Sequence, residues 1–284
     1  MSKRSMISCL AARRDFSVPH KTHVLHRKDW FHNSDKFSIH NTLDCPELHD
    51  EIRKLMISSF YKEAPIPLAL NLARNGCQST HDFLNKEINT ALNSGTSIVY
   101  KDPATKNIIS VALNLIWERN EEYKVVGASA KEWHNSASEI VNKTSESSIK
   151  RHLQWRKYQF QHIYDMGQKL LKENPEKKYA VYLSTGYINP EFRRTARSSS
   201  QQISRLDDYH AHWDLSHCII YLATTFSKMD DYIQENYPSY IPIDHVKYSD
   251  LNLVLEDKKC FQPFEHLGGI TYRADFLNDF VYKN

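Results

Sequence analysis

Glycine is scarce in this chain, and its distribution excludes two common nucleotide sites. Only 7 of the 284 residues are glycines, and none lies in residues 189–200, which join a strand-like segment to a helix-like one. The Walker and dinucleotide-binding fingerprints need glycines at fixed positions, because a backbone without side chains lets phosphates approach closely. Neither fingerprint is therefore present in this loop.

Long apolar runs are also missing. The longest run, Cys218–Ala223, has the length of a strand, whereas a helix that crosses a bilayer needs about 20 apolar residues. We therefore expect a soluble protein that does not act at a membrane.

The five cysteines are odd in number and lack any C-x-x-C spacing, which is typical of reduced thiols in an intracellular protein. Residues 1–14 are basic and rich in serine and contain no acid, a composition that organelle transit peptides share. A frayed basic N-terminus explains this composition better, and we expect a cytoplasmic protein.

The charged residues point to neither nucleic acid nor metal. A formal net charge of +3, from 37 basic and 34 acidic residues, is too small to indicate nucleic-acid binding, and no motif for such binding occurs. His20, His23 and His26 have H-x-x-H-x-x-H spacing, but without neighbouring cysteines a solvated segment is a better interpretation than a zinc site. The acidic pairs at 207–208 and 230–231 lack a glycine loop, so we expect them on solvated helix faces.

The first third of the chain predicts an arm followed by the start of a domain. Residues 1–35 show no regular period and indicate an irregular N-terminal arm, whereas 36–284 form a single domain with a polar insertion at 118–148. Asp44 and Glu47 have the spacing of a capping box, so we expect Asp44 to cap a helix that reaches Phe60 and follows a strand at 36–42.

The remaining pattern alternates helical and strand-like segments. A second helix is expected at 80–93, ending before Gly95, and the turn sequence KDPATK predicts a β-hairpin between two β-branched segments. Further elements are expected at 96–100, 107–117, 149–174 (helix), 180–188, 203–213 (helix), 217–223, 226–233 (helix), 243–248 and 269–274. This order predicts an α/β (α+β) fold with a mixed, mostly antiparallel central sheet flanked by helices.

One segment combines a buried strand with a basic, serine-rich loop. Residues 180–195 read AVYLSTGYINPEFRRT, with a turn at Asn189 and Pro190, and ARSSSQQ follows. Backbone N–H groups at the start of a helix carry partial positive charge, and arginines add full charges. The segment therefore suits a phosphate-rich ligand held beside the end of a strand.

Three stretches together resemble the GNAT superfamily of N-acetyltransferases, and among its branches the arylalkylamine (dopamine-type) N-acetyltransferases most. FYKEAPIPLAL at 60–70 resembles that branch's F-x-x-D-E-P-L segment, and GTSIVYKDPATKNIISVALN at 95–114 resembles its second and third strands. HVKYSDLNLVLEDKKCFQPFEH at 245–266 resembles its tail, where Y-x-D precedes F-x-P and a histidine. The resemblance covers roughly residues 37–276 and implies a GNAT-like fold.

The resemblance implies acetyl transfer from acetyl-CoA to a small primary amine by direct attack. The family's phosphate loop, Arg/Gln-x-x-Gly-x-Gly/Ala, falls on positions where glycines are replaced by Ala196 and Ser198. The loop is accordingly expected to hold the pyrophosphate through Arg193, Arg194, Thr195, Ala196, Arg197 and Ser198. The strand backbone at Ile188 and Asn189 is expected to polarise the thioester oxygen.

The same resemblance implies proton-transfer residues, two of which differ here. The branch's catalytic glutamate falls on Ala64, beside Glu63, and its two serines fall on Ala223 and Ser227. We expect a base at Glu63, because a protonated amine has no lone pair for attack. The hydroxyl positions are expected to be filled by Ser227 and Thr224, although Thr224 could instead cap the following helix. The acid that meets the departing thiolate is expected at Tyr232.

The substitutions at Ala64 and Ala223 leave a second interpretation open. The chain would then be a non-catalytic protein that kept the fold and binds CoA or a partner. The sequence does not specify the acceptor amine or the oligomeric state.

Overall fold

The computed structural model describes residues 23–26, 36–60, 78–119, 124–125, 128–129, 147–189, 218–225, 227–254, 261, 266 and 268–276. These residues contain a ten-stranded sheet in which eight strands follow the order β1-β2-β3-β4-β7-β8-β10-β9, while β5 pairs with β4 and β6 pairs with β5. All pairs in it are antiparallel except β7 with β8. The expected mixed, mostly antiparallel sheet is confirmed.

The strands have the following bounds: β1 His23–His26, β2 Lys36–Asn41, β3 Ile98–Lys101, β4 Ile108–Glu118, β5 Lys124–Val125, β6 Ala128–Ser129, β7 Tyr179–Ile188, β8 Cys218–Thr224, β9 Ile241–Lys247 and β10 Gly269–Asp275. The longer helices are α2 His49–Leu55, α5 Gln78–Leu92, α7 Ser147–Glu173, α9 Ser227–Asn236 and α10 Tyr248–Val254. The predicted hairpin, the long helix and the later strands are therefore confirmed to within a few residues. The helix expected at 203–213 lies outside the described residues.

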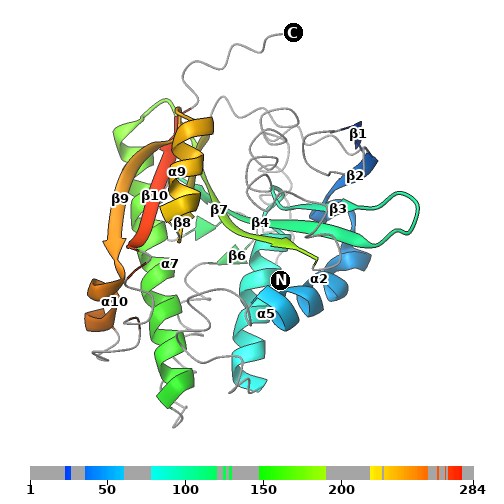
Figure 1. The fold of residues 1–284 in the computed structure, drawn as a ribbon, viewed down its shortest axis with the longest axis horizontal. Helices are drawn as coiled ribbons and strands as arrows, with labels where there is room; N and C mark the ends of the chain where they lie inside the picture. Colours follow the sequence, from blue (N-terminus) through cyan, green and yellow to red (C-terminus); the bar gives the residue numbers. More distant parts are fainter. Residues whose placement is uncertain are drawn as a thin grey trace, which may run out of the picture.

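Helices cover both faces of the sheet. Alternate residues of β7 belong to different cores, with Tyr182 in one and Val181 and Leu183 in the other, because successive side chains of a strand point to opposite faces. The first core includes residues of α2, α5, α7 and α10, and the second includes Ile233 of α9. Figure 1 shows α9 in front of β8 and β10, with α7 and α5 on the other side of the sheet.

The start of the first helix differs from the prediction. Asn41, not Asp44, is the capping residue, since its side chain accepts a hydrogen bond from the Leu43 amide at 2.8 Å. Two 3₁₀ turns, Thr42–Asp44 and Pro46–Leu48, precede α2. Pro46 has no N–H and suits the first position of a helical turn, so it starts a second turn and delays α2 to His49.

Two short elements were not expected. His23–His26 form β1, paired with β2, so this part of the arm is not irregular. Tyr248–Val254 form α10 between the last two strands.

None of the described helices combines the length and apolar character needed to span a bilayer.

Gly167 lets α7 lie close against the sheet. A Cβ atom at this position would come within 2.9 Å of both Trp117 Cδ1 and the Tyr221 hydroxyl oxygen. Both side chains are completely buried, and the Tyr221 hydroxyl donates to the Ile163 carbonyl of α7 at 2.8 Å. The missing side chain therefore sets the distance between the helix and the strands β4 and β8.

We predict that Gly167→Ala lowers the free energy of unfolding, although alanine favours helices by about 1 kcal/mol. The extra methyl group must displace Trp117 or Tyr221, and such overpacking costs roughly 1–3 kcal/mol. Urea denaturation measures the change, with the exposed Lys169→Ala on the same helix as a control. Equal or greater stability of Gly167→Ala would contradict the close approach.

Candidate functional site

β7 and β8 are paired over only part of their length. Their parallel register runs from Tyr179 opposite Cys218 to Leu183 opposite Leu222. β7 then continues to Ile188 beside β4, whereas β8 continues to Thr224 beside β10. The two strands therefore diverge beyond Leu183 and Leu222, and the sheet opens between their C-terminal ends.

A register shift lies where the divergence begins. Between Leu113 and Leu115 of β4, the partner on β7 changes from Thr185 to Tyr182, so β7 has one extra residue opposite Asn114. A β-bulge of this kind increases local twist and bends the strand that carries it. The bulge thus explains why β7 leaves β8 at this position.

Asn114, which faces the bulge, is held by a buried polar network. It is completely buried, and its side-chain amide donates to the Thr96 carbonyl at 2.6 Å. Its backbone N–H donates to the Ser97 hydroxyl at 2.9 Å, and that hydroxyl donates to the Ala91 carbonyl at 2.7 Å. The network fixes β4 where its partner strand is irregular.

The backbone of β7 presents one edge to the opening. The N–H of Asn189 donates to the Ile109 carbonyl of β4 at 2.9 Å. Because residues of an antiparallel pair alternate between hydrogen-bonded and non-bonded positions, the N–H groups of Gly186 and Ile188 point away from β4. They point to the side from which β8 has diverged.

The side chains also change character at the opening. Residues 184–186 of β7 are half-buried, whereas the residues on either side, Leu183 and Tyr187, are buried. The exposed stretch includes two hydroxyls, since Ser184 Oγ lies 3.4 Å from Thr185 Oγ1. The structure thus combines polar side chains and strand-edge amides at this position.

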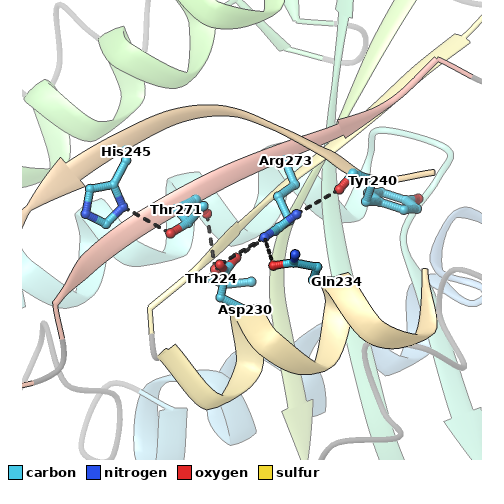
Figure 2. A network of polar contacts seen from close by, with 7 residues as sticks. All are labelled: Thr224, Asp230, Gln234, Tyr240, His245, Thr271 and Arg273. Carbon is cyan, nitrogen blue, oxygen red and sulfur yellow. Dashed lines mark hydrogen bonds and ion pairs between the residues drawn. The ribbon is translucent and has the colours of Figure 1, made fainter. Parts of the chain in front are cut away.

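The end of β8 is fixed by contacts to α9 and β10. Thr224 is buried, and its hydroxyl oxygen lies 3.0 Å from Asp230 Oδ1 and 3.3 Å from the carbonyl oxygen of Thr271. On the next strand, His245 Nδ1 lies 3.1 Å from the Thr271 hydroxyl. Figure 2 shows these contacts side by side between α9 and β10. The Thr224 hydroxyl thus joins the end of β8 to both α9 and β10.

Arg273 of β10 forms the centre of this network. Its guanidinium donates to both carboxylate oxygens of Asp230 at 2.7 and 3.0 Å, to the Tyr240 carbonyl at 3.0 Å and to Gln234 Oε1 at 3.3 Å, as Figure 2 shows. The Arg273 side chain is 5% exposed and that of Asp230 is 21% exposed. The hydrogen bond from Arg273, and a weaker one from Thr224, hold the pKa of Asp230 below its usual value against the effect of partial burial.

A second contact anchors the turn between β8 and α9. The hydroxyl of Tyr248, the first residue of α10, donates to the Thr225 carbonyl at 3.0 Å. Tyr248 is completely buried, and burial raises its pKa to about 12, so it is a neutral donor throughout the physiological range. Thr224 and Thr225 are therefore held from different sides.

The expected catalytic residues on α9 lie on different flanks. Ser227 is exposed and begins α9. At about 100° per residue, Ser227 lies about 60° around the helix from Asp230, on nearly the same side. Tyr232 is half-buried and lies about 200° from Asp230, on the far side. The network therefore fixes Ser227 more directly than Tyr232.

Other predicted site residues cannot be placed. Ile188 and Asn189 end β7 beside the opening, as described above. Glu63, Ala64 and the loop residues Arg193 to Ser198 lie outside the described residues, so their roles stay predictions. Within the described part of the chain, no cluster of three or more His, Cys, Asp or Glu side chains is arranged to hold a metal.

Arg273 was not among the predicted site residues, and the predicted surroundings of Asp230 were wrong. Asp230 was expected on a solvated helix face, but it is ion-paired with a buried arginine. The available signal was Arg273 itself, a charged residue in the otherwise buried strand GITYRAD. A buried arginine requires a nearby anion, but the sequence alone does not identify which of the 34 acidic residues supplies it.

The fold is similar to those of several solved structures, which include N-acetyltransferases of insects. Arylalkylamine N-acetyltransferase 2 from Aedes aegypti superposes with a TM-score of 0.60 and 16% identity, over 85% of this chain and 99% of the other. The polyamine N-acetyltransferase of Drosophila melanogaster superposes with a TM-score of 0.53 and 11% identity, over 84% of this chain and 98% of the other. The C-terminal condensation domain of Ebony, in complex with β-alanyl-dopamine, superposes with a TM-score of 0.50 and 14% identity, over 81% of this chain and 94% of the other.

These comparisons establish the fold expected from the sequence. At such low identity they establish the fold alone. No protein-family model matches the sequence, and no curated protein is significantly similar to it.

We predict that Asp230→Asn lowers the free energy of unfolding by about 2–4 kcal/mol at pH 7, because it leaves the buried Arg273 charge without its counter-ion. A carboxylate with a lowered pKa contributes stability that is fully present above its unfolded pKa of about 3.9 and is lost as pH falls through the folded value. The difference between wild type and variant should therefore be constant from pH 7 to about 5 and decrease below about pH 4.

Urea denaturation at several pH values tests this prediction. If the free energies of unfolding of wild type and Asp230→Asn differ as much at pH 3.5 as at pH 7, the Asp230 carboxylate does not supply the stability.

Proposed function

We propose that this chain, which has the fold of the arylalkylamine N-acetyltransferases, is an acyltransferase that transfers acetyl from acetyl-CoA to a small primary amine. The observation that carries the proposal is the divergence of β7 and β8 at the bulge. An extended thioester ligand in the opening would meet the N–H edge of β7 on one side and the end of β8 on the other. No other site in the described residues combines a strand's N–H edge with the end of a neighbouring, diverging strand.

The acceptor class is supported by the proteins of similar fold. Their names specify arylalkylamines, polyamines and, for a mutant enzyme of TM-score 0.54 and 11% identity, agmatine. Ebony's domain was solved with β-alanyl-dopamine. These ligands share an amine or the amide made from one, and an amine acceptor is therefore the proposed class for this chain.

The donor would be held at two points. In the proposal, the loop from Arg193 to Ser198 binds the pyrophosphate of acetyl-CoA through its arginines and backbone amides. The N–H of Ile188 donates to the thioester oxygen, where negative charge develops as the amine attacks. Asn189 continues the strand, with its N–H committed to β4, and leads into the loop.

The reaction requires three proton transfers. Glu63 takes a proton from the ammonium, and the free amine nitrogen then attacks the thioester carbon. The carbon–sulfur bond breaks, and the departing thiolate takes a proton from Tyr232. The attacking nitrogen loses its second proton to the tyrosinate as the amide forms, so that Tyr232 is restored and the net proton released is the one held by Glu63. In the proposal, Ser227 at the exposed start of α9 hydrogen-bonds the reacting groups. Thr224 contributes through its fixed hydroxyl, which already contacts Asp230 and is better suited to supporting the site than to moving a proton.

A second function is favoured by two substitutions. Ala64 and Ala223 replace a carboxylate and a hydroxyl of the family pattern. A non-catalytic protein that binds CoA or a partner would retain the opening but would not need these groups. Ligand binding without amine-dependent release of CoA distinguishes this alternative from the enzyme.

The first expected result is a thermal shift with acetyl-CoA. A ligand at 100 times its Kd adds about 2.7 kcal/mol of stability, which should raise the Tm by roughly 5–10 °C in a domain of this size. Adenosine is the control, because it lacks both pyrophosphate and thioester. No shift at millimolar acetyl-CoA would reject both the enzyme and the CoA-binding alternative.

A variant of the loop tests where the pyrophosphate binds. Replacing Arg193, Arg194 and Arg197 with alanine should raise the KM for acetyl-CoA by roughly 10-fold or more, because charge-assisted hydrogen bonds to phosphate are lost. The KM for the amine should stay the same. Lys172→Ala, at an exposed position of α7, is the matched control for loss of charge. An unchanged KM for acetyl-CoA in the triple variant would reject the loop assignment.

A further inference from the structure

The turn that joins β8 to α9 is connected to β10 and α10 by side-chain contacts. Asp230 of α9 pairs with Arg273 of β10, the Thr224 hydroxyl of β8 contacts Asp230 and the Thr271 carbonyl of β10, and the Tyr248 hydroxyl of α10 donates to the Thr225 carbonyl. A turn at the surface of a protein does not need this number of buried polar contacts to be stable. The contacts converge on the end of β8 that borders the opening.

The Arg273–Asp230 contact has the geometry of a positioning element. The planar guanidinium donates two hydrogen bonds to one carboxylate, and such bidentate pairs fix orientation as well as distance. Two more donors of Arg273 reach the Tyr240 carbonyl and Gln234. These contacts tie α9 to β10 (Figure 2).

Ser227 lies one helical turn before Asp230, on nearly the same side of α9. Its position depends on the orientation of the first turn of the helix, which Asp230 ties to β10 through Arg273. A small rotation of α9 would move Ser227 away from the opening. In catalysis, misplacement by about 1 Å can cost roughly 100-fold in rate.

We propose that Arg273, Asp230 and Tyr248 are positioning residues that hold Ser227 at the opening between β7 and β8. This inference rests on the proposed acyltransferase function. Asp230 orients the first turn of α9, Arg273 fixes Asp230 to β10, and Tyr248 fixes the preceding turn at Thr225. None of the three contacts the reacting atoms.

The experiment compares two ion pairs of the same kind in one molecule. Arg156 of α7 binds both carboxylate oxygens of Glu87 on α5, with side chains 15% and 13% exposed. This pair lies on the opposite side of the sheet from α9, in the layer of α5 and α7. Glu87→Gln therefore removes a comparable charge pair without touching the β8–α9 turn.

Asp230→Asn should lower kcat for amine acetylation by roughly 10-fold to 100-fold, with an unchanged KM for acetyl-CoA. Glu87→Gln should lower kcat by less than about 2-fold at a temperature where both variants are fully folded, since coupling between distant sites is small. Tyr248→Phe, which removes one hydroxyl and keeps the ring, should act as Asp230→Asn does but less strongly. This milder variant provides the test if Asp230→Asn does not fold.

A double-mutant cycle with Ser227→Ala separates positioning from stability. If Asp230 acts through Ser227, Ser227→Ala alone should lower kcat, and adding Asp230→Asn should have little further effect. Three results would overturn the positioning role. The losses of kcat in the two single variants could multiply in the double variant, or Ser227→Ala could be as active as wild type. Asp230→Asn and Glu87→Gln could also lower kcat equally. Wild-type protein that binds acetyl-CoA but acetylates no amine would instead overturn the acyltransferase function and, with it, this inference.

Discussion

The bulge in β7 opposite Asn114 is the constraint on which the candidate site depends. Among the described strands, β7 has partners on both sides before the bulge, whereas after it β7 pairs with β4 and β8 pairs with β10. Buried backbone groups must be paired, so an opening inside a sheet persists only where the adjoining strands are fixed by other partners. Asn114 and Ser97 fix one border, and the Arg273 network fixes the other.

The two borders differ in how they are stabilised. The border formed by β4 and β7 is held by backbone pairing and by uncharged side chains with complete burial. The border formed by β8 and β10 is held by an ion pair between a nearly buried arginine and a partly exposed aspartate. Charged contacts of this kind are poor evidence for stability but specify a single arrangement. The opening thus lies between a border fixed by uncharged buried groups and one fixed by an ion pair.

Sequence patterns predicted the helices and strands that are determined by residues close together in the chain. Apolar residues at helical spacing located α7, and the apolar run at Cys218–Ala223 located β8. The first helix began later than expected because Pro46 starts a separate turn, and α10 was missed because its seven residues are too few to carry a clear period. Of the site residues implied by the family resemblance, Thr224 lies at the end of β8 and Ser227 at the start of α9, and their roles stay predictions. The bulge carries no glycine signal, and Arg273 lies 43 residues from Asp230, so neither could be derived from local sequence.

Amide NMR shows whether the opening binds a thioester along the edge of β7. Of the four N–H groups from Gly186 to Asn189, those of Gly186 and Ile188 point away from β4, whereas those of Tyr187 and Asn189 point towards it. Titration of ¹⁵N-labelled protein with acetyl-CoA should therefore shift the Gly186 and Ile188 amide protons much more than those of Tyr187 and Asn189. Equal shifts at all four amides, or none at any of them with acetyl-CoA bound, would contradict the account.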